Sequence, residues 1–181
     1  MIGNDIVDLQ LANHQSNWQR RGWLQKIFTK TELQYIYTSE NIELQIWKFW
    51  SMKEAAYKAH QRRFNFFPKY NPKSYQCTLN GAVNVDNDVY KTITLSQDEY
   101  VYSIARISSD KGYYSSVYDK KVDVHSKLKE IITKKLNISS PLIYFRKNSR
   151  GVPIINIDEH SLELPISITH HGQYSACVVT F

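Results

Sequence analysis

The sequence predicts an α+β protein, because helical and strand-like segments follow one another without a regular strand–helix–strand repeat. Strand-like residues open the chain, helix-like segments follow, and further strands then surround one more helix. The 181 residues are 42% hydrophobic and 13% aromatic, which is enough for a packed core and does not favour disorder. Low-complexity tracts and long linkers are absent from the sequence.

The first part of the chain combines one strand with several helices. A β-branched run predicts a strand in residues 2–9. Apolar residues recur at helical spacing in residues 23–28, and Thr29 with Glu32 three positions later is typical of a capping box that begins another helix. The longest helix is expected at about 44–62, where apolar residues repeat every three or four positions.

Antiparallel strands are expected after a loop at residues 62–73. Alternating runs predict strands at 75–79, 89–95 and 100–107, and the first two of these are connected by turn-forming asparagine, glycine and aspartate clusters. The Ser-Ser-Asp-Lys-Gly segment at 108–112 is the best candidate for a boundary between two halves.

The rest of the chain repeats the pattern of a helix packed on an antiparallel sheet. Residues 124–136 are amphipathic, with lysines on the polar side. Strands are expected at 142–145, 152–157, 165–169 and 174–181.

Charge and composition limit the choice of partners. A net charge of +6 and a sequence pI of about 9.2 favour a polyanion, which includes nucleic acid, an anionic membrane surface, a phosphorylated ligand or an acidic protein. The sequence contains no apolar run long enough to cross a membrane and no basic leader followed by an apolar run, so we expect a cytoplasmic protein. Cys77 and Cys177 are expected to be two buried thiols.

Two carboxylates and one lysine are candidates for chemistry. Glu54 and Lys58 are four positions apart on the predicted helix and share one face, either as a surface ion pair or as two groups directed at a metal-bound phosphate. The apolar neighbours of Asp5 indicate burial, which requires a partner or a cation unless Asp5 is a cap or turn residue at a strand edge. Asp5 and Glu54 together would suit Mg²⁺, which takes one or two carboxylates and substrate phosphates.

These residues lie in motifs that resemble the 4′-phosphopantetheinyl transferases. Residues 2–6 (Ile-Gly-Asn-Asp-Ile) resemble the family's Gly-x-Asp-Ile motif, and 50–58 (Trp-Ser-Met-Lys-Glu-Ala-Ala-Tyr-Lys) resemble its Lys-Glu motif. Residues 27–32 resemble the Phe-Thr-x-x-Glu stretch of the holo-acyl-carrier-protein synthases. Residues 151–153 (Gly-Val-Pro) and 165–170 (Pro-Ile-Ser-Ile-Thr-His) resemble the superfamily's Gly-Lys-Pro and Ser-x-Ser-His motifs.

The resemblance implies the family's fold, with two halves related by a pseudo-twofold axis. Residues 1–110 would carry the Asp and Lys-Glu motifs, and 111–181 the Gly-x-Pro and Ser-x-Thr-His motifs. The large two-half members have the opposite order, so the resemblance favours a monomer with its halves permuted. A trimer with active sites between subunits is the alternative.

The resemblance also implies an activity, namely Mg²⁺-dependent transfer of 4′-phosphopantetheine from coenzyme A to a serine of an acidic apo acyl or peptidyl carrier protein. Such transfer releases 3′,5′-ADP and serves pathways such as fatty-acid or polyketide synthesis. Asp5 and Glu54 would hold Mg²⁺, while Glu54 and Lys58 would be the catalytic residues.

Coenzyme A binding is likewise assigned by the resemblance, with His170 on the 3′-phosphate. Val152 replaces the lysine of the Gly-Lys-Pro motif, and nearby basic residues would substitute for it. The residues assigned to coenzyme A are Lys58, Thr169, His170, Lys147 and Arg150.

Two departures concern the metal ligands and the docking surface. Val7 occupies the position of a third acidic ligand in many large members, and strand alternation points Asp8 away from Asp5, so Asp8 is expected to support the site or cap a helix. A basic surface that docks the acidic carrier is expected in the segment after the first motif, at Arg20, Arg21 and Lys26. Residues 62–70 form a second candidate surface.

Two other functions are compatible with parts of the sequence. Aromatic and basic residues alternate between positions 57 and 75, which is compatible with nucleic-acid binding but leaves Asp5 and Glu54 unexplained. A relative that binds coenzyme A without transferring the arm would fit the replacements at Val7 and Val152.

Overall fold

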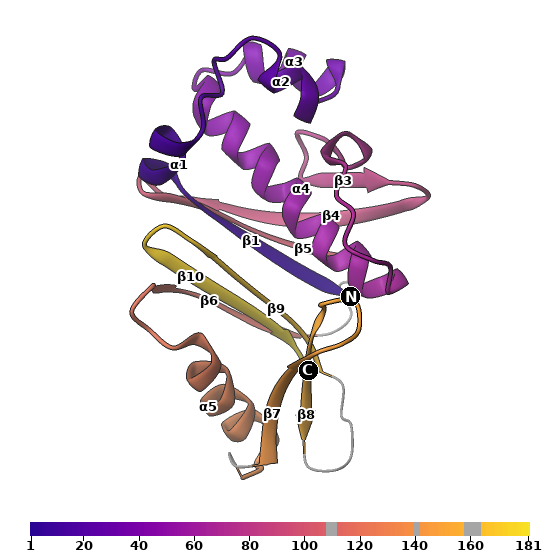
Figure 1. The fold of residues 1–181 in the computed structure, drawn as a ribbon, viewed down its shortest axis with the longest axis vertical. Helices are drawn as coiled ribbons and strands as arrows, with labels where there is room; N and C mark the ends of the chain where they lie inside the picture. Colours follow the sequence, from indigo (N-terminus) through magenta and orange to yellow (C-terminus); the bar gives the residue numbers. More distant parts are fainter. Residues whose placement is uncertain (108–111, 140–141, 158–163) are drawn as a thin grey trace.

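Two five-stranded antiparallel sheets organise the protein in the computed structural model, which describes residues 1–107, 112–139, 142–157 and 164–181 (Figure 1). The strand order is β1-β5-β4-β3-β2 in the first sheet and β6-β10-β9-β8-β7 in the second. Both sheets therefore have the same topology, in which the first strand lies beside the last and the others follow in reverse order. The predicted boundary after residue 110 lies outside the described residues, so the assignment of the motifs to two halves stays a prediction.

The strands of the first sheet are β1 (Ile2–Asp8), β2 (Gln76–Cys77), β3 (Ala82–Val85), β4 (Asp88–Ser96) and β5 (Tyr100–Arg106). Those of the second sheet are β6 (Tyr113–Asp119), β7 (Ile143–Lys147), β8 (Pro153–Ile157), β9 (Leu164–His171) and β10 (Tyr174–Thr180). The helices are α1 (Leu9–Gln15), α2 (Trp23–Ile27), α3 (Lys30–Tyr37), α4 (Ile42–Phe64) and α5 (Val124–Leu136), with a short 3₁₀ turn, η1, at Pro72–Ser74.

Three apolar clusters show that the elements form four layers, in the order helix, sheet, sheet, helix. The largest cluster lies between α4 and the first sheet, and includes Phe49 and Val101. A second cluster lies between the two sheets, where Ile6 and Ala176 are buried. The third joins α5 to the outer face of the second sheet. Because apolar burial stabilises every layer contact, the facing surfaces of β1 and β9 are held in fixed relation.

The predicted α+β class is confirmed, and so are its longest elements. Helix α4 covers the predicted segment, the capping box of Thr29 and Glu32 begins α3, and the predicted helix at 124–136 is α5. The sequence analysis did not predict α1 and β3. Both are short, and β3 lies between two turn-forming clusters that conceal its four residues.

Two further observations concern composition. Cys77 and Cys177 are both free and buried, as predicted. Within the described part of the chain, no helix combines the length and the apolar character needed to span a membrane.

Candidate active site

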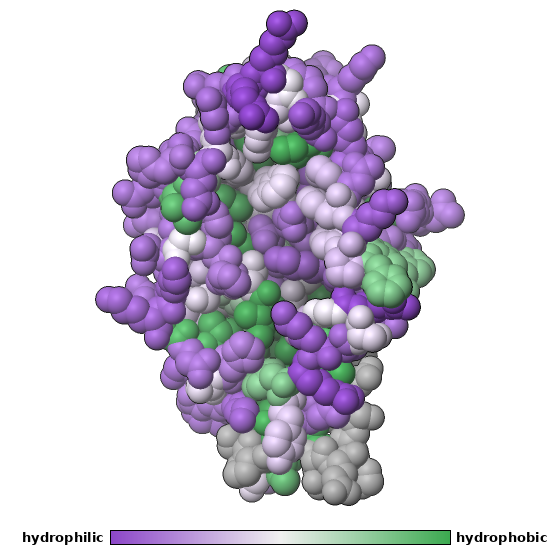
Figure 2. Space-filling model, viewed as in Figure 1, coloured by the Kyte–Doolittle hydropathy of each residue, from purple (hydrophilic) through white to green (hydrophobic). Residues whose placement is uncertain are grey.

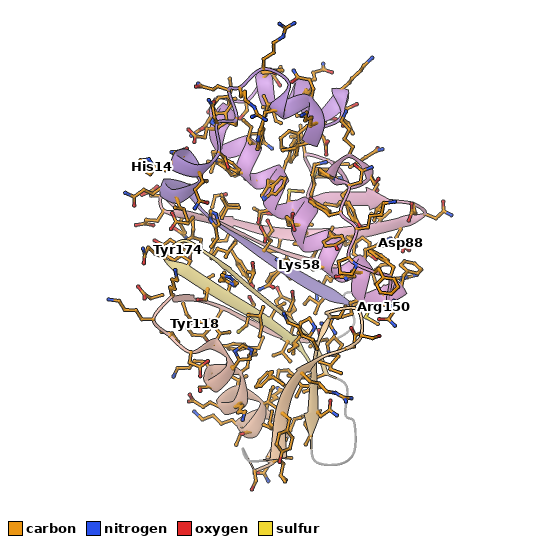
Figure 3. The ribbon with its side chains drawn as sticks, in the orientation of Figure 1. His14, Lys58, Asp88, Tyr118, Arg150 and Tyr174 are labelled. Carbon is orange, nitrogen blue, oxygen red and sulfur yellow. The ribbon has the colours of Figure 1, made fainter. Side chains whose placement is uncertain are left out.

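Lys58 connects three elements at the centre of the molecule (Figure 3). Its Nζ lies 2.9 Å from Asp5 Oδ1 on β1 and donates to the backbone oxygen of Asn4 at 3.0 Å and to Thr169 Oγ1 on β9 at 3.2 Å. The Thr169 hydroxyl in turn lies 3.3 Å from Asp5 Oδ1. The structure therefore brings together Asp5, Lys58 and Thr169, which the sequence analysis selected from three distant motifs.

The glycine of the first motif permits this close contact between β1 and α4. A Cβ atom at Gly3 would lie 2.3 Å from the backbone oxygen of Ala55 and 2.6 Å from the backbone nitrogen of Ala59, distances that no side chain can occupy. The Ser51 hydroxyl also donates to the backbone oxygen of Asp5 at 3.1 Å. The side chain of Asp5 is consequently held near the helix face that carries Lys58.

Glu54 lies one helical turn before Lys58 and is mostly buried. Burial raises the pKa of its carboxyl group from 4.5 to about 7, the negative charge of Asp5 contributes to the rise, and Lys58 opposes it. The charge of Asp5 thus acts on Glu54, and Lys58 is a cation that interacts with both carboxylates. A glutamate with a pKa near neutrality is able to accept a proton under physiological conditions.

The donor set at this cluster fits a magnesium ion. No group of three or more histidine, cysteine, aspartate or glutamate side chains that could hold a metal occurs among the described residues. The two interacting carboxylates of Asp5 and Glu54 nevertheless supply hard oxygen ligands of the number that Mg²⁺ usually takes from a protein, with substrate phosphates and water completing its shell. Burial is the main cause of the raised pKa of Glu54, and the repulsion from Asp5 that adds to it is of the kind that a divalent cation relieves.

A comparison with known families decides the assignment. A family model of the 4′-phosphopantetheinyl transferase superfamily matches residues 1–105, which is more than half of the chain. The chain belongs to this superfamily. The family and the fold class predicted from the motifs are thereby confirmed, and the matched region contains Asp5, Glu54 and Lys58 but not Thr169.

Other comparisons add little to this result. A crystal structure of Helicobacter pylori holo-acyl-carrier-protein synthase in complex with coenzyme A aligns over 100% of both chains, with 15% identity and a TM-score of 0.29. These values are too low to carry an argument about this chain. No curated protein matches the sequence.

Two other residues of the motifs form a buried ion pair: Lys53 of the Lys-Glu motif and Glu32 of the Phe-Thr-x-x-Glu stretch. Lys53 Nζ lies 2.7 Å from Glu32 Oε1, and both side chains are almost fully buried. Glu32 Oε1 also accepts from the backbone nitrogen of Cys77, while Oε2 accepts from the backbone nitrogen of Thr29. This pair connects α3, α4 and β2. Lys53 of the Lys-Glu motif therefore has a structural partner, whereas Glu54 of the same motif lies at the site.

Asp8 caps a helix, which is one of the two roles predicted for it. Its Oδ1 accepts from the backbone nitrogen of Leu11 at the start of α1, and its Oδ2 accepts from the backbone nitrogen of Gln173. The backbone nitrogen of Asp8 donates to His171 Nδ1 at 2.9 Å. Asp8 therefore connects β1 and α1 to the turn between β9 and β10.

The two neighbouring histidines of the Ser-x-Thr-His motif have different surroundings. Residues 167, 169 and 171 alternate onto the face of β9 that contacts β1, because Ser167 accepts from the backbone of Asn4 and His171 from that of Asp8. His170 lies on the other face and is exposed. The structure thus brings His171 to β1, although the motif selected His170, and strand alternation is the signal that distinguishes the two.

Within the described part of the chain, the side chains of Lys147 and Arg150 make no hydrogen bond to Asp5, Lys58 or Thr169. Lys147 is exposed at the end of β7. The guanidinium of Arg150 stacks on the ring of Phe67, 3.4 Å from its centroid, and the backbone oxygen of Arg150 accepts from Gln61. Figure 3 shows Arg150 beside the far end of α4. A cavity of about 330 Å³ at this junction is lined in part by Val152.

The predicted docking residues are accessible. Arg20 and Arg21 are exposed in the segment between α1 and α2, and Lys26 is exposed on α2. Figure 2 shows hydrophilic side chains projecting from the end of the molecule where Figure 1 places α2 and α3. Their role in docking stays a prediction.

The aromatic residues that favoured nucleic-acid binding pack mainly against one another. The ring of Tyr57 lies 4.8 Å from that of Tyr70 and 5.9 Å from that of Tyr75, between centroids. Tyr75 is buried. These three rings therefore form a cluster beside α4, which weakens the case that they stack on bases.

Proposed function

We propose that this chain transfers the 4′-phosphopantetheine group of coenzyme A to a serine of an apo carrier protein and releases 3′,5′-ADP. The observation that supports this most directly is the convergence of Asp5, Lys58 and Thr169 beside Glu54. The cluster combines two carboxylates, which would hold a metal cation, with a lysine, whose ammonium is a point charge. A diphosphate would bind to both the cation and the ammonium.

Asp5 and Glu54 would hold Mg²⁺, which would stabilise the negative charge that develops on the diphosphate during transfer. Lys58 is one turn from Glu54 and reaches the same space, so its ammonium would bind the phosphate oxygens directly. Thr169, which already donates and accepts within the cluster, would orient the coenzyme A phosphates from the second sheet.

Glu54 would accept the proton of the carrier serine. The serine oxygen forms a new bond to the phosphorus that carries the pantetheine arm, and the bond from that phosphorus to the 3′,5′-ADP oxygen breaks with its electron pair. A base is most effective when its pKa lies near the working pH, and the pKa of Glu54 is raised to about 7.

The proposed assembly is a monomer that docks an acidic carrier through Arg20, Arg21 and Lys26. One chain supplies Asp5 and Lys58 from the first sheet and α4, and Thr169 from the second sheet, so the cluster needs no other subunit. The basic charge of the chain supports an acidic partner. His170, Lys147 and Arg150 remain proposed contacts of coenzyme A.

The decisive experiment incubates the protein with coenzyme A, Mg²⁺ and a panel of apo carrier proteins, and then measures the intact mass of each carrier. We expect one carrier to gain the mass of the phosphopantetheine arm at its serine. Binding of coenzyme A without modification of any carrier would favour a relative that lacks transfer. Tight binding of random single-stranded DNA with a steep salt dependence would instead favour the nucleic-acid function.

A further inference from the structure

An unpartnered hydroxyl group lies beside the proposed active site. The hydroxyl of Tyr70 is buried and has no hydrogen-bond partner among the described residues. A buried polar group in this state costs about 1–3 kcal/mol, and native proteins rarely retain one without a reason. A substrate that accepts a hydrogen bond would supply such a reason.

The ring of Tyr70 stands over the helical turn that carries Glu54. It packs edge-on against Trp50, with centroids 6.0 Å apart, and at a tilt against Tyr57, with centroids 4.8 Å apart. Trp50, Glu54 and Tyr57 follow one another at intervals of four and three residues and therefore share one face of α4. Since Tyr70 contacts the residues on either side of Glu54, its side chain lies next to the proposed base.

The ring is also fixed in place. In addition to Trp50 and Tyr57, it contacts Tyr75, with centroids 5.7 Å apart. The following residues, Pro72–Ser74, form the 3₁₀ turn η1, which Asn71 caps through its side chain. A hydroxyl that is held by three aromatic neighbours needs little reorganisation to bind a ligand.

The charges around this hydroxyl keep it protonated. Burial raises the pKa of Tyr70, and the negative charges of Glu54 and Asp5 raise it further. Tyr70 is therefore a neutral hydrogen-bond donor near two carboxylates, neither of which it reaches. An acceptor atom supplied by a ligand would give this hydroxyl the hydrogen bond that it lacks among the described residues.

We propose that Tyr70 is a substrate-binding residue whose hydroxyl donates a hydrogen bond to a phosphate oxygen of the coenzyme A diphosphate. This inference rests on the proposed function, which brings that diphosphate to Asp5, Glu54 and Lys58. Lys58 supplies a positive charge from one side, and Tyr70 supplies a neutral donor that does not compete with Lys58 for the carboxylates.

The test compares Tyr70→Phe with Tyr75→Phe, a matched control from the same aromatic cluster. Burial is the main cause that raises the pKa of Tyr75, and the charge of Glu54 is the smallest, so its hydroxyl is less exposed to the site's charges. Binding of coenzyme A and of dephospho-coenzyme A, which lacks the 3′-phosphate, is measured by calorimetry with Mg²⁺ present. Thermal unfolding of each protein without ligand is measured in parallel.

We expect Tyr70→Phe to be as stable as the wild type or slightly more stable, because it loses only an unpartnered hydroxyl. Its affinity for both ligands should fall about tenfold to a hundredfold, the usual effect of losing a hydrogen bond to a charged group. Tyr75→Phe should bind both ligands like the wild type. The equal loss for both ligands would place the contact on the diphosphate.

Unchanged affinity of Tyr70→Phe would overturn the inference and leave Tyr70 a packing residue. Loss of affinity for coenzyme A alone would place the hydroxyl at the 3′-phosphate and also contradict the proposal. A wild-type protein that does not bind coenzyme A would refute the proposed function together with this inference. A wild type that binds but does not transfer would refute the transfer step alone, because the binding comparison remains valid.

Discussion

Lys58 on α4 and Asp5 on β1 form an ion pair, with Nζ and Oδ1 2.9 Å apart, in a region that also contains Glu54. This contact connects the Lys-Glu motif to the Gly-x-Asp motif, which lie 53 positions apart in the sequence. The residues that surround the pair determine which substitutions should affect catalysis and which should affect folding.

Replacing Asp5 with asparagine should abolish most of the activity while preserving the fold. Asparagine keeps the size of the side chain but removes the charge that attracts Lys58 and would hold Mg²⁺. We expect the transfer rate to fall about a hundredfold or more, as for other preorganised electrostatic groups, when modified carrier is quantified by mass spectrometry. Asp98→Asn in an exposed turn is the control, and similar rates for both variants would contradict the assignment.

Glu54 should make the stability of the protein depend on pH. Because its folded pKa of about 7 exceeds the unfolded value of 4.5, the native state binds more protons between these values, and stability should fall as the pH rises from about 4.5 to about 7. The shift corresponds to about 3 kcal/mol. Urea unfolding without Mg²⁺ measures this effect. Glu54→Gln should lose the pH dependence and be more stable than the wild type above pH 7. Parallel curves of stability against pH for the two proteins would contradict the raised pKa of Glu54.

Gly3 should not tolerate even the smallest side chain. Gly3→Ala would force the backbone of β1 away from Ala55 and Ala59, which lie within 2.6 Å of the added atom. We expect a loss of about 3 kcal/mol or more, at the upper end of the range for overpacked cores. Gly112→Ala has free space around it and should leave the unfolding midpoint nearly unchanged. Equal midpoints for the two variants would show that β1 and α4 can separate at no cost.

The buried pair of Lys53 and Glu32 should contribute to folding far more than a surface pair. Lys53→Met leaves the Glu32 carboxylate buried without its cation, which typically costs about 3–5 kcal/mol. Lys127→Met removes one of the two lysines that pair with Glu130 on the exposed side of α5 and should change stability by less than about 1 kcal/mol. Urea unfolding of both variants measures the difference, and an equally small effect of the two substitutions would contradict the contribution assigned to the buried pair.

The two adjacent histidines should have separable roles. His171→Ala removes the acceptor of the Asp8 backbone nitrogen and should lower stability by about 1 kcal/mol or more. His170→Ala should leave stability unchanged, since His170 is exposed. If His170 binds the 3′-phosphate, its removal should reduce the preference for coenzyme A over dephospho-coenzyme A. A loss of that preference in His171→Ala alone would assign the 3′-phosphate to the other histidine.

The sequence allowed the prediction of helices α2 to α5 and of the residue types at the site, because local spacing determines both. Glu54 and Lys58 share a helix face at any position in a fold, so their proximity follows from the sequence. The contact of Lys58 with Thr169 could be predicted only through the resemblance, since 111 positions separate the two residues.

Other features required the three-dimensional structure. The difference between His170 and His171 depends on which face of β9 meets β1, and a motif does not state this. The pairing of Lys53 with Glu32 depends on how α3 packs on α4. The unpartnered hydroxyl of Tyr70 is the least predictable, because its burial results from contacts with three other rings.

Each sheet pairs only strands that are consecutive in its own part of the chain or that begin and end it: β1 pairs with β5, and β6 pairs with β10. In the described ranges, the two sheets meet through side chains and share no backbone ladder. Gene duplication, fusion or reordering can therefore rearrange such units during evolution without breaking a strand pairing. The orientation of one unit against the other would then depend on the few side chains that join them, among them Lys58 and Thr169.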